Sequence, residues 1–151
     1  MTLTEKEKGL LKDLRNQEQL CIGKYEKYAQ DAKAEELKCL FGDLKSTEEA
    51  HLRSIDSLMN GTVPTAPDTI SGSDNTHTAT VSYQNESDRQ SDAFLCRDML
   101  ATEKHASALY NTSVFEFSDP AARKLLNHIE AEEQQHGEKL YAYMSSNNMY
   151  N

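Results

Sequence analysis

The segment STEEAHLRSI at residues 46–55 has a counterpart 85 residues further along the chain, AEEQQHGEKL at residues 131–140. Each segment holds one Glu-x-x-His motif, formed by Glu48 with His51 and by Glu133 with His136. In a helix this spacing puts both side chains on one face, one turn apart. Because the motif occurs twice at a fixed interval, the sequence indicates an internal repeat, and a repeat constrains the whole architecture.

The repeat extends beyond these two motifs. The same shift pairs Glu18 with Glu103, Tyr25 with Tyr110 and Leu40 with Leu125. In each half, 30 residues separate the single glutamate from the glutamate of the motif, and the midpoint, near residue 33 or 118, falls on a predicted turn. Two antiparallel helices folded there bring the paired glutamates to one height, roughly 20 Å from the turn. The sequence therefore predicts an all-α chain of two similar helical hairpins.

Start and stop signals give the expected boundaries. Thr4 and Glu7 have the spacing of a capping box, Asn60-Gly61 is a helix stop, and Asp119-Pro120 is a helix start. We expect one domain with four parts: hairpin one at 4–60, a polar crossover at 61–90, hairpin two at 91–146 and a short, frayed polar tail at 147–151. A crossover of this length can run along the whole bundle, so the second and third helices should be parallel.

Four glutamates interrupt the apolar stripes of these helices. The four rows, each with steps of three or four residues, are Leu14, Glu18, Cys21; Leu44, Glu48, His51; Met99, Glu103, Ala106; and Ile129, Glu133, His136. Each acid therefore lies on the face that packs into the core. Burying an unpaired carboxylate is costly, so these acids need a compensating charge.

Two divalent cations would balance four carboxylates. One glutamate from each of two helices, plus Glu-x-x-His from each of the other two, is the ligand set of ferritin-like proteins with two metal ions. The predicted ligands are Glu18, Glu48, His51, Glu103, Glu133 and His136. Carboxylate and imidazole ligands suit iron, the metal we expect, with manganese or zinc as alternatives. The competing interpretation is a degenerate or empty site whose acids are ordinary surface charges.

Other residues near the stripes carry open alternatives. Tyr25 and Tyr110 are either core aromatics or tyrosines whose hydroxyls orient metal-bound carboxylates. Cys21 is a small core residue or a redox-sensitive thiol beside the metals. The remaining neighbours receive no role in the site: Glu49 and Glu132 are expected to be solvated, His105 and His128 to be surface or paired histidines, and His77 lies in the crossover.

Composition excludes several classes of protein. The formal net charge of −9 and the lack of a basic stripe exclude nucleic acid as the expected partner. The sequence contains no run of about 18 apolar residues, so no membrane span is predicted, and the first residues do not resemble a signal peptide. The three cysteines are sparse, which is typical of a reducing compartment.

Three stretches carry a family resemblance: NQEQLCIGKYEKYA at 16–29, STEEAHLRSI at 46–55, and LCRDMLATEKHASALYNTSVFEFSDPAARKLLNHIEAEEQQHGEKLYAYM at 95–144. They resemble Coat F-type spore coat proteins, within the ferritin-like, rubrerythrin-like superfamily. The resemblance implies the six ligands named above. It also implies synthesis in the mother-cell cytoplasm, association with the spore coat, and other coat proteins or a second copy of the chain as partners.

The resemblance and the ligands point to different functions. A coat component would use the metal mainly to stabilise its bundle, whereas a di-iron oxidase or peroxidase of the rubrerythrin type would protect against oxygen or peroxide. The chain lacks the cysteine-rich module through which rubrerythrins receive electrons, so enzymatic turnover does not follow from the resemblance. A third possibility, docking of coat or membrane partners through the crossover, has little support in the sequence.

Overall fold

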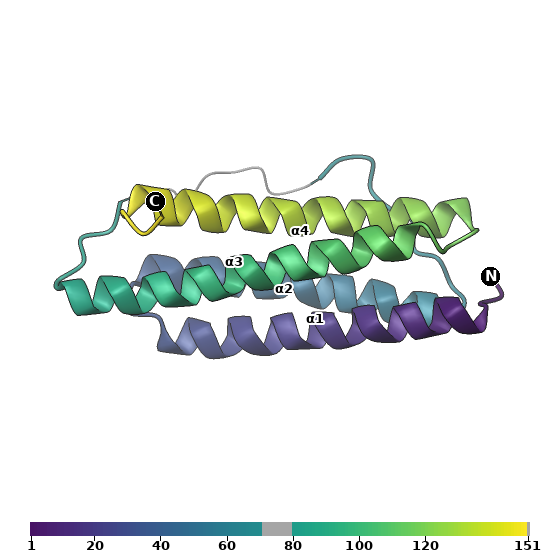
Figure 1. Ribbon diagram of the computed structural model, residues 1–151, viewed down its shortest axis with the longest axis horizontal. Coiled ribbons are helices and arrows are strands. Elements are labelled where there is room, and N and C mark those ends of the chain that lie inside the picture. The colour runs from purple at the N-terminus through teal and green to yellow at the C-terminus, as the bar shows by residue number, and fades with distance from the viewer. Residues whose placement is uncertain (71–79, 151) are drawn as a thin grey trace.

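The computed structural model describes residues 1–70 and 80–150, and in this part of the chain it contains four α-helices and no strand. The helices are α1 (Glu5–Asp31), α2 (Glu35–Met59), α3 (Glu86–Val114) and α4 (Pro120–Ser146). They lie side by side along the long axis of the molecule (Figure 1). The predicted all-α class and the number of helices are confirmed.

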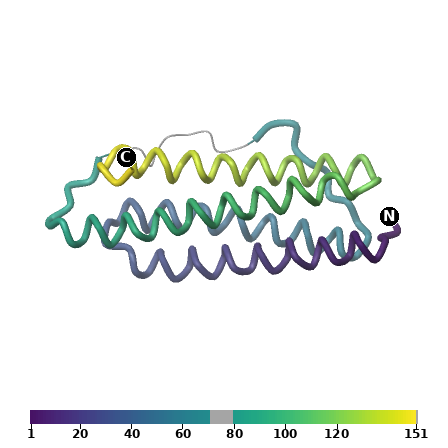
Figure 2. The backbone as a smooth tube through the Cα atoms, viewed as in Figure 1, coloured from purple at the N-terminus to yellow at the C-terminus, as the bar shows by residue number. Residues whose placement is uncertain are grey.

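The helices form two hairpins joined by a long connection. The backbone trace in Figure 2 runs along α1 and returns along α2, and α3 then starts at the end of the bundle opposite to the end of α2, with α4 returning along it. Helices α2 and α3 therefore run in the same direction, as the sequence predicts. The described ends of the connection, residues 60–70 and 80–85, lie near opposite ends of the bundle.

Local sequence sets most helix ends. The Thr4 hydroxyl accepts a hydrogen bond from the backbone N–H of Glu7, and the Glu7 carboxylate accepts one from the N–H of Thr4, which completes the predicted capping box. At the other hairpin, Asp119 accepts from the N–H of Ala122. Helix α2 ends before Gly61, whose φ of +83° is in the left-handed region that glycine adopts at little cost.

Helix α3 begins earlier than predicted. Its first residue is Glu86, whereas the sequence places the start of hairpin two at residue 91, so the connection is shorter than the expected 61–90. The side chain of Asn85 caps the helix by accepting from the N–H of Asp88. This polar first turn carries no apolar residue, which explains why the periodicity that predicts the helix does not reach it.

The turn that precedes α2 is held by a residue from another helix. Ala34 precedes α2 and has no side chain that could cap it. Instead, the fully buried carboxylate of Asp92 in α3 accepts hydrogen bonds from the backbone N–H groups of Lys33, at 2.7 Å, and Ala34, at 3.0 Å. The same carboxylate accepts a 2.8 Å bond from the Tyr83 hydroxyl. Asp92 thereby joins the two hairpins and the end of the crossover.

The C-terminal tail is ordered against the bundle, so the expectation of a frayed tail at 147–151 is wrong for the described residues 147–150. The Asn147 side chain accepts a 2.8 Å hydrogen bond from the N–H of Val81, and the Met149 carbonyl accepts one from Arg97. Met149 is almost fully buried. The polar composition of the tail hides these contacts, because they depend on the folded crossover and on α3.

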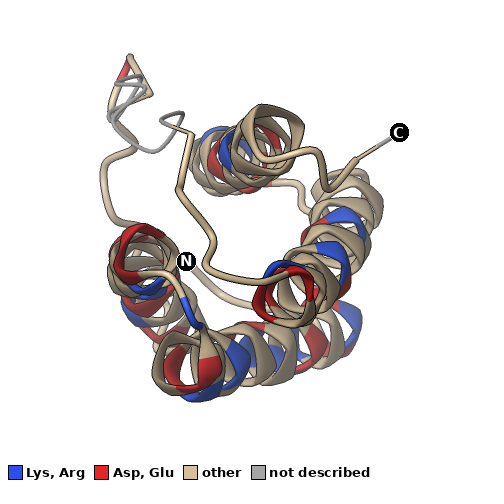
Figure 3. Cartoon of the chain, turned by 90° about the vertical axis from the view of Figure 1, so that its left-hand side faces the viewer, with Lys and Arg blue, Asp and Glu red and all other residues tan. Residues whose placement is uncertain are grey.

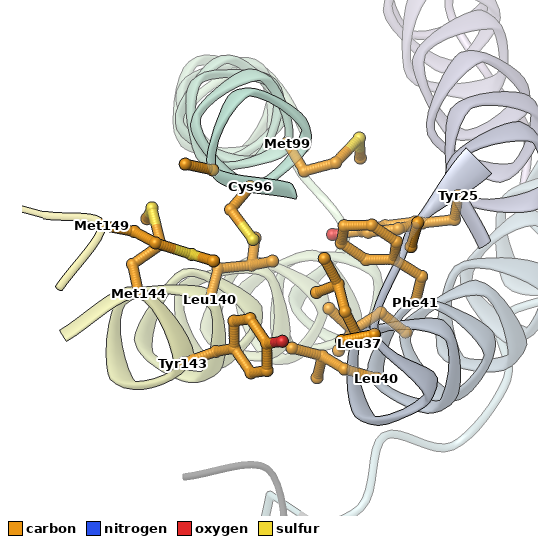
Figure 4. Packing of buried hydrophobic residues seen from close by; sticks show 14 residues of the cluster. Tyr25, Leu37, Leu40, Phe41, Cys96, Met99, Leu140, Tyr143, Met144 and Met149 are labelled. Atoms are coloured by element: carbon orange, nitrogen blue, oxygen red, sulfur yellow. The ribbon is translucent and has the colours of Figure 1, made fainter. Parts of the chain in front are cut away.

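Buried apolar residues form two clusters, one toward each end of the bundle. The first includes Leu37, Leu40, Phe41, Met99, Leu140 and Tyr143 and is drawn in Figure 4. The second includes Leu11, Leu14, Ile55, Leu58, Leu126 and Ile129. Between them lies a layer of buried charged residues, described next.

Charged residues also cover the helices. In the end-on view of Figure 3, acidic and basic residues are interspersed along them. None of the four helices in the described part of the chain has the length and apolar character needed to cross a membrane.

Candidate metal centre

The structure brings the six predicted ligands together in the middle of the bundle. One glutamate comes from each helix, and the two histidines come from α2 and α4. All six side chains are buried, with at most 3% of any of them exposed: Glu18, Glu48, His51, Glu103, Glu133 and His136. A layer of four acids and two imidazoles thus separates the two apolar clusters.

The donor atoms fall into two overlapping groups. One consists of Glu18, Glu48, His51 and Glu133, and the other consists of Glu48, Glu103, Glu133 and His136. Within each group the candidate donor atoms all lie within 4.8 Å of one another. Glu48 and Glu133 belong to both groups. Each group therefore has the residues to hold one ion, and the two shared carboxylates can contact both ions.

These residues contain all the unpaired polar side-chain atoms that are buried in the described part of the chain. Eight such atoms make no hydrogen bond of normal geometry: one oxygen each of Glu18 and Glu103, both oxygens of Glu48 and Glu133, and Nδ1 of His51 and His136. Nδ1 of each histidine nevertheless lies 2.7 Å from a glutamate oxygen, so four of the eight atoms are in close His–Glu contacts. Buried polar atoms are nearly always hydrogen-bonded, so a concentration of exceptions needs a physical explanation. The donor set of carboxylate oxygens and imidazole nitrogens fits a pair of divalent cations.

The two histidines make equivalent contacts across the bundle. Nδ1 of His51 is 2.7 Å from Oε1 of Glu133, and Nδ1 of His136 is 2.7 Å from Oε1 of Glu48. Shifting the first pair by 85 residues gives the second. Each imidazole thus directs Nδ1 toward a carboxylate that both groups share.

The two tyrosines, on the other pair of helices, also make equivalent contacts across the bundle. The Tyr25 hydroxyl in α1 donates a 2.6 Å hydrogen bond to Oε1 of Glu103 in α3, and the Tyr110 hydroxyl donates a 2.5 Å bond to Oε1 of Glu18. Each tyrosine therefore fixes a carboxylate of the opposite hairpin and leaves its second oxygen without a partner. Of the two interpretations of these tyrosines, the structure favours the orienting one.

Glu132 takes part in the surroundings of the site, contrary to the expectation that it is solvated. Only 12% of its side chain is exposed, and its Oε1 lies 3.0 Å from Nε2 of His51 and 3.2 Å from Nε2 of His128. A carboxylate that accepts from the outer nitrogen of an imidazole fixes its orientation and leaves the inner nitrogen free to bind. Glu132 lies off the apolar stripe, but its spacing of four residues from His128 is a signal that could have linked the two.

Electrostatics favour retained protons when no cation is bound. Burial, together with the negative charge of Glu48, raises the pKa of Glu18 well above its ordinary value. Burial and the charges of Glu48 and Glu103 do the same to the pKa of Glu133. Buried carboxylates that repel one another take up protons, so protons and cations would compete for this site.

The acidic neighbours raise the pKa values of both histidines. Burial alone would lower the pKa of His136, but Glu103 and Glu48 raise it to about 10. Burial likewise opposes charging of His51, and contacts with Glu132 and Glu48 still raise its pKa. Without a cation the imidazoles are therefore the positive charges of the site.

The remaining candidates lie at its margin or away from it. Cys21 is fully buried, and burial together with nearby acids raises the pKa of its thiol, so the interpretation as a core residue fits better than that as a reactive thiolate. Glu49 is partly exposed and His105 is exposed. His77 lies outside the described residues.

Comparison with known proteins adds one finding. The Coat F domain family matches residues 91–151, which include α3 after its first turn, α4 and the C-terminal tail. The predicted resemblance to Coat F proteins is therefore confirmed for the second hairpin, while the ferritin-like placement stays a prediction. No curated protein and no solved structure matches the chain.

Proposed function

We propose that this chain is a spore coat-associated protein whose ferritin-like bundle binds two divalent metal ions, with iron as the expected metal. The Coat F match at residues 91–151 supports the coat role. One observation carries the metal site: the eight unpaired buried side-chain atoms in the described part of the chain all belong to the six residues that the sequence predicts as ligands. Synthesis in the mother cell and assembly with other coat proteins follow from the same resemblance.

The donor atoms divide naturally between two ions. Glu18 and His51 would hold one ion, Glu103 and His136 would hold the other, and Glu48 and Glu133 would contact both, in agreement with the two overlapping groups. Four carboxylates and two dications are electrically balanced, which removes the cost of burying the acids unpaired. In an empty site, protons on the acids and on the two imidazoles would have to supply this compensation.

Surrounding side chains would hold the ligands in place. Tyr25 and Tyr110 each keep one carboxylate oxygen engaged, so that the other oxygen faces the centre of the site. Glu132 does the same for the imidazole of His51. Such supporting contacts restrict the ligands before an ion binds.

The metal content of two variants tests this proposal. Glu48→Ala and Glu133→Ala should each lower the stoichiometry below two ions per chain, measured by elemental analysis after anaerobic purification, because each removes a carboxylate that both groups share. Glu49→Ala is the matched control, since it removes a neighbouring acid outside both groups. Equal metal content in all three variants would refute the assignment.

A di-iron oxidase or peroxidase of the rubrerythrin type is the second candidate. A cavity beside α3 and α4 has Glu103 and Glu133 among its lining residues, so an external molecule has a place to approach the site. Two ferrous ions would supply electrons for the reduction of peroxide or oxygen. Iron-loaded protein mixed with peroxide should then be oxidised much faster than free ferrous ion, and equal rates would exclude this activity.

A further inference from the structure

A cavity of about 300 Å³ lies between α3 and α4 and reaches the edge of the candidate metal centre. Its lining includes Leu100, Ser107 and Gly137, together with the candidate ligands Glu103 and Glu133. The carboxylates themselves are at most 1% exposed, so the cavity ends at the ligand layer and does not open it to solvent.

Small residues create this space on one side of the molecule. A Cβ atom added to Gly137 would lie 3.6 Å from Cδ1 of Leu100, which is ordinary contact, so the missing side chain of Gly137 leaves room above Leu100. The residues equivalent under the 85-residue shift are larger: Leu52 corresponds to Gly137 and Ile22 to Ser107. The two hairpins thus present the same ligands but differ in the bulk of the side chains beside them.

We propose that this α3–α4 cavity is the passage by which small exogenous ligands of two or three heavy atoms, such as azide, reach the metal ions. The proposal rests on the proposed metal site and adds the route of access. Gly137 and Leu100 lie close together on one side of the passage, since a Cβ atom on Gly137 would already contact Leu100, so a larger side chain at residue 137 would narrow the passage.

Once bound cations neutralise the carboxylates of Glu103 and Glu133, Lys104 is the one remaining charge among the lining residues, and it favours small anions as the molecules that pass. Lys104 is an exposed cation in the lining and Leu100 supplies an apolar wall. A positive charge near an opening raises the local concentration of anions and slows the approach of cations. Removing this charge by Lys104→Gln should therefore slow azide association and weaken its dependence on salt.

Azide binding to Co²⁺-loaded protein tests the passage. The variant Gly137→Leu fills the cavity with the residue that hairpin one carries at the equivalent position. We expect azide association, followed by stopped-flow absorption of Co²⁺, to slow about tenfold or more, because Leu100 and the new side chain must move apart first. The Co²⁺ stoichiometry should stay the same. Unchanged azide kinetics would overturn the proposal.

Gly23→Leu is the matched control. Gly23 also lies inside a helix, is exposed, and has no atom within 4 Å of an added Cβ. Both substitutions remove the helix penalty of glycine, about 1 kcal/mol, so a change in azide kinetics confined to Gly137→Leu comes from the cavity. Slowing by Gly23→Leu to the same extent would contradict the proposal.

A metal-free measurement separates the passage from the metal site. Crystals of the metal-free protein under krypton pressure should show a krypton atom in the cavity lined by Leu100, Ser107 and Gly137, and Gly137→Leu should abolish it. Absence of krypton from wild-type crystals would overturn the passage whatever the metal content. If krypton binds but wild-type protein holds no Co²⁺, the proposed metal function fails and the cavity cannot serve it.

Discussion

The two hairpins agree where the candidate ligands lie and differ around them. Under the 85-residue shift every candidate ligand and both tyrosines coincide, and the tyrosine and histidine contacts of one hairpin reproduce those of the other. The surrounding positions do not coincide: Glu132 corresponds to Thr47, Gly137 to Leu52 and Ser107 to Ile22. Two ions need ligands from both hairpins, so the ligand positions are the same in both. A single cavity and a single supporting carboxylate, Glu132, need to be present in only one hairpin.

The helix ends differ in a similar way. Helix α4 is capped by Asp119, the residue just before it, but the equivalent of Asp119 in hairpin one is Ala34, which cannot cap α2. Asp92 of α3 instead binds the backbone N–H groups of Lys33 and Ala34 in the turn before α2. Hairpin two therefore caps its second helix locally, while the turn of hairpin one is held by the partner hairpin.

The largest expected effect follows from removing the metal, which should destabilise both hairpins at the layer they share. Ligand binding to the native state adds about 2.7 kcal/mol per site at a hundredfold excess over the dissociation constant. Thermal melts at neutral pH should therefore give a clearly lower Tm for metal-free protein than for the metal-loaded form. Coincident melts would show that the six residues do not form a buried metal site.

The gap between the two forms should widen as the pH rises. Burial raises the folded-state pKa of Glu18 and Glu133 well above the ordinary 4.5, and acidic neighbours raise that of His136 from 6.5 to about 10. A raised pKa means that the folded state binds more protons than the unfolded chain. The metal-free protein thus loses stability from about pH 4.5 upward, until the pH passes the folded-state values. Melts of metal-free protein at pH 5.5 and 8.5 should show a higher Tm at pH 5.5.

The third prediction compares the contact between the hairpins with the local helix cap. Asp92→Ala should lower the free energy of unfolding by about 3 kcal/mol, because it leaves the N–H groups of Lys33 and Ala34 and the Tyr83 hydroxyl without their charged acceptor. Asp119→Ala removes a local cap and should cost about 1 kcal/mol. Urea unfolding of metal-free protein measures both, and equal losses would mean that Asp92 does not join the hairpins.

Asp92 also shows which contacts could not be predicted from the sequence. The repeat, the capping signals and the apolar stripes predicted four helices and a common layer for the six charged residues, because each rests on local periodicity. The role of Asp92 depends on the docking of α3 against the first turn, which no local pattern describes. The sequence nevertheless holds a signal for Asp92. It precedes Cys96, Met99 and Glu103 at helical spacing, so it lies on the same buried face of the helix as Glu103.

Other contacts could not be predicted from the sequence for a different reason. Glu132 contacts His51 from α4, and the tail packs through Met149 and Asn147 against the folded crossover and α3. These residues lie off the stripe or in a polar segment, so their burial depends on tertiary neighbours rather than on periodicity. Sequence reasoning therefore found the repeated layer and missed the contacts that occur in only one half.

The fourth prediction tests the equivalence of the two hairpins at the site itself. Tyr25→Phe and Tyr110→Phe each remove one hydroxyl that orients a candidate ligand, and each should weaken metal binding about tenfold. Because the two hydrogen bonds are equivalent, the losses measured by calorimetric titration should be equal. A loss confined to one variant would show that the hairpins contribute unequally even at the shared layer.

The smallest overall effect, confined to one of the two ions, is expected where the hairpins differ. Glu132→Ala removes the carboxylate beside Nε2 of His51, so binding of the ion held by His51 should weaken about tenfold, while the ion held by His136 is unaffected. Calorimetric titration should then resolve two unequal binding steps. His128→Ala is the control, since it removes the other partner of Glu132 and leaves the contact with His51 in place. If Glu132→Ala weakens both steps equally, the carboxylate acts through the overall charge of the site and not by orienting His51.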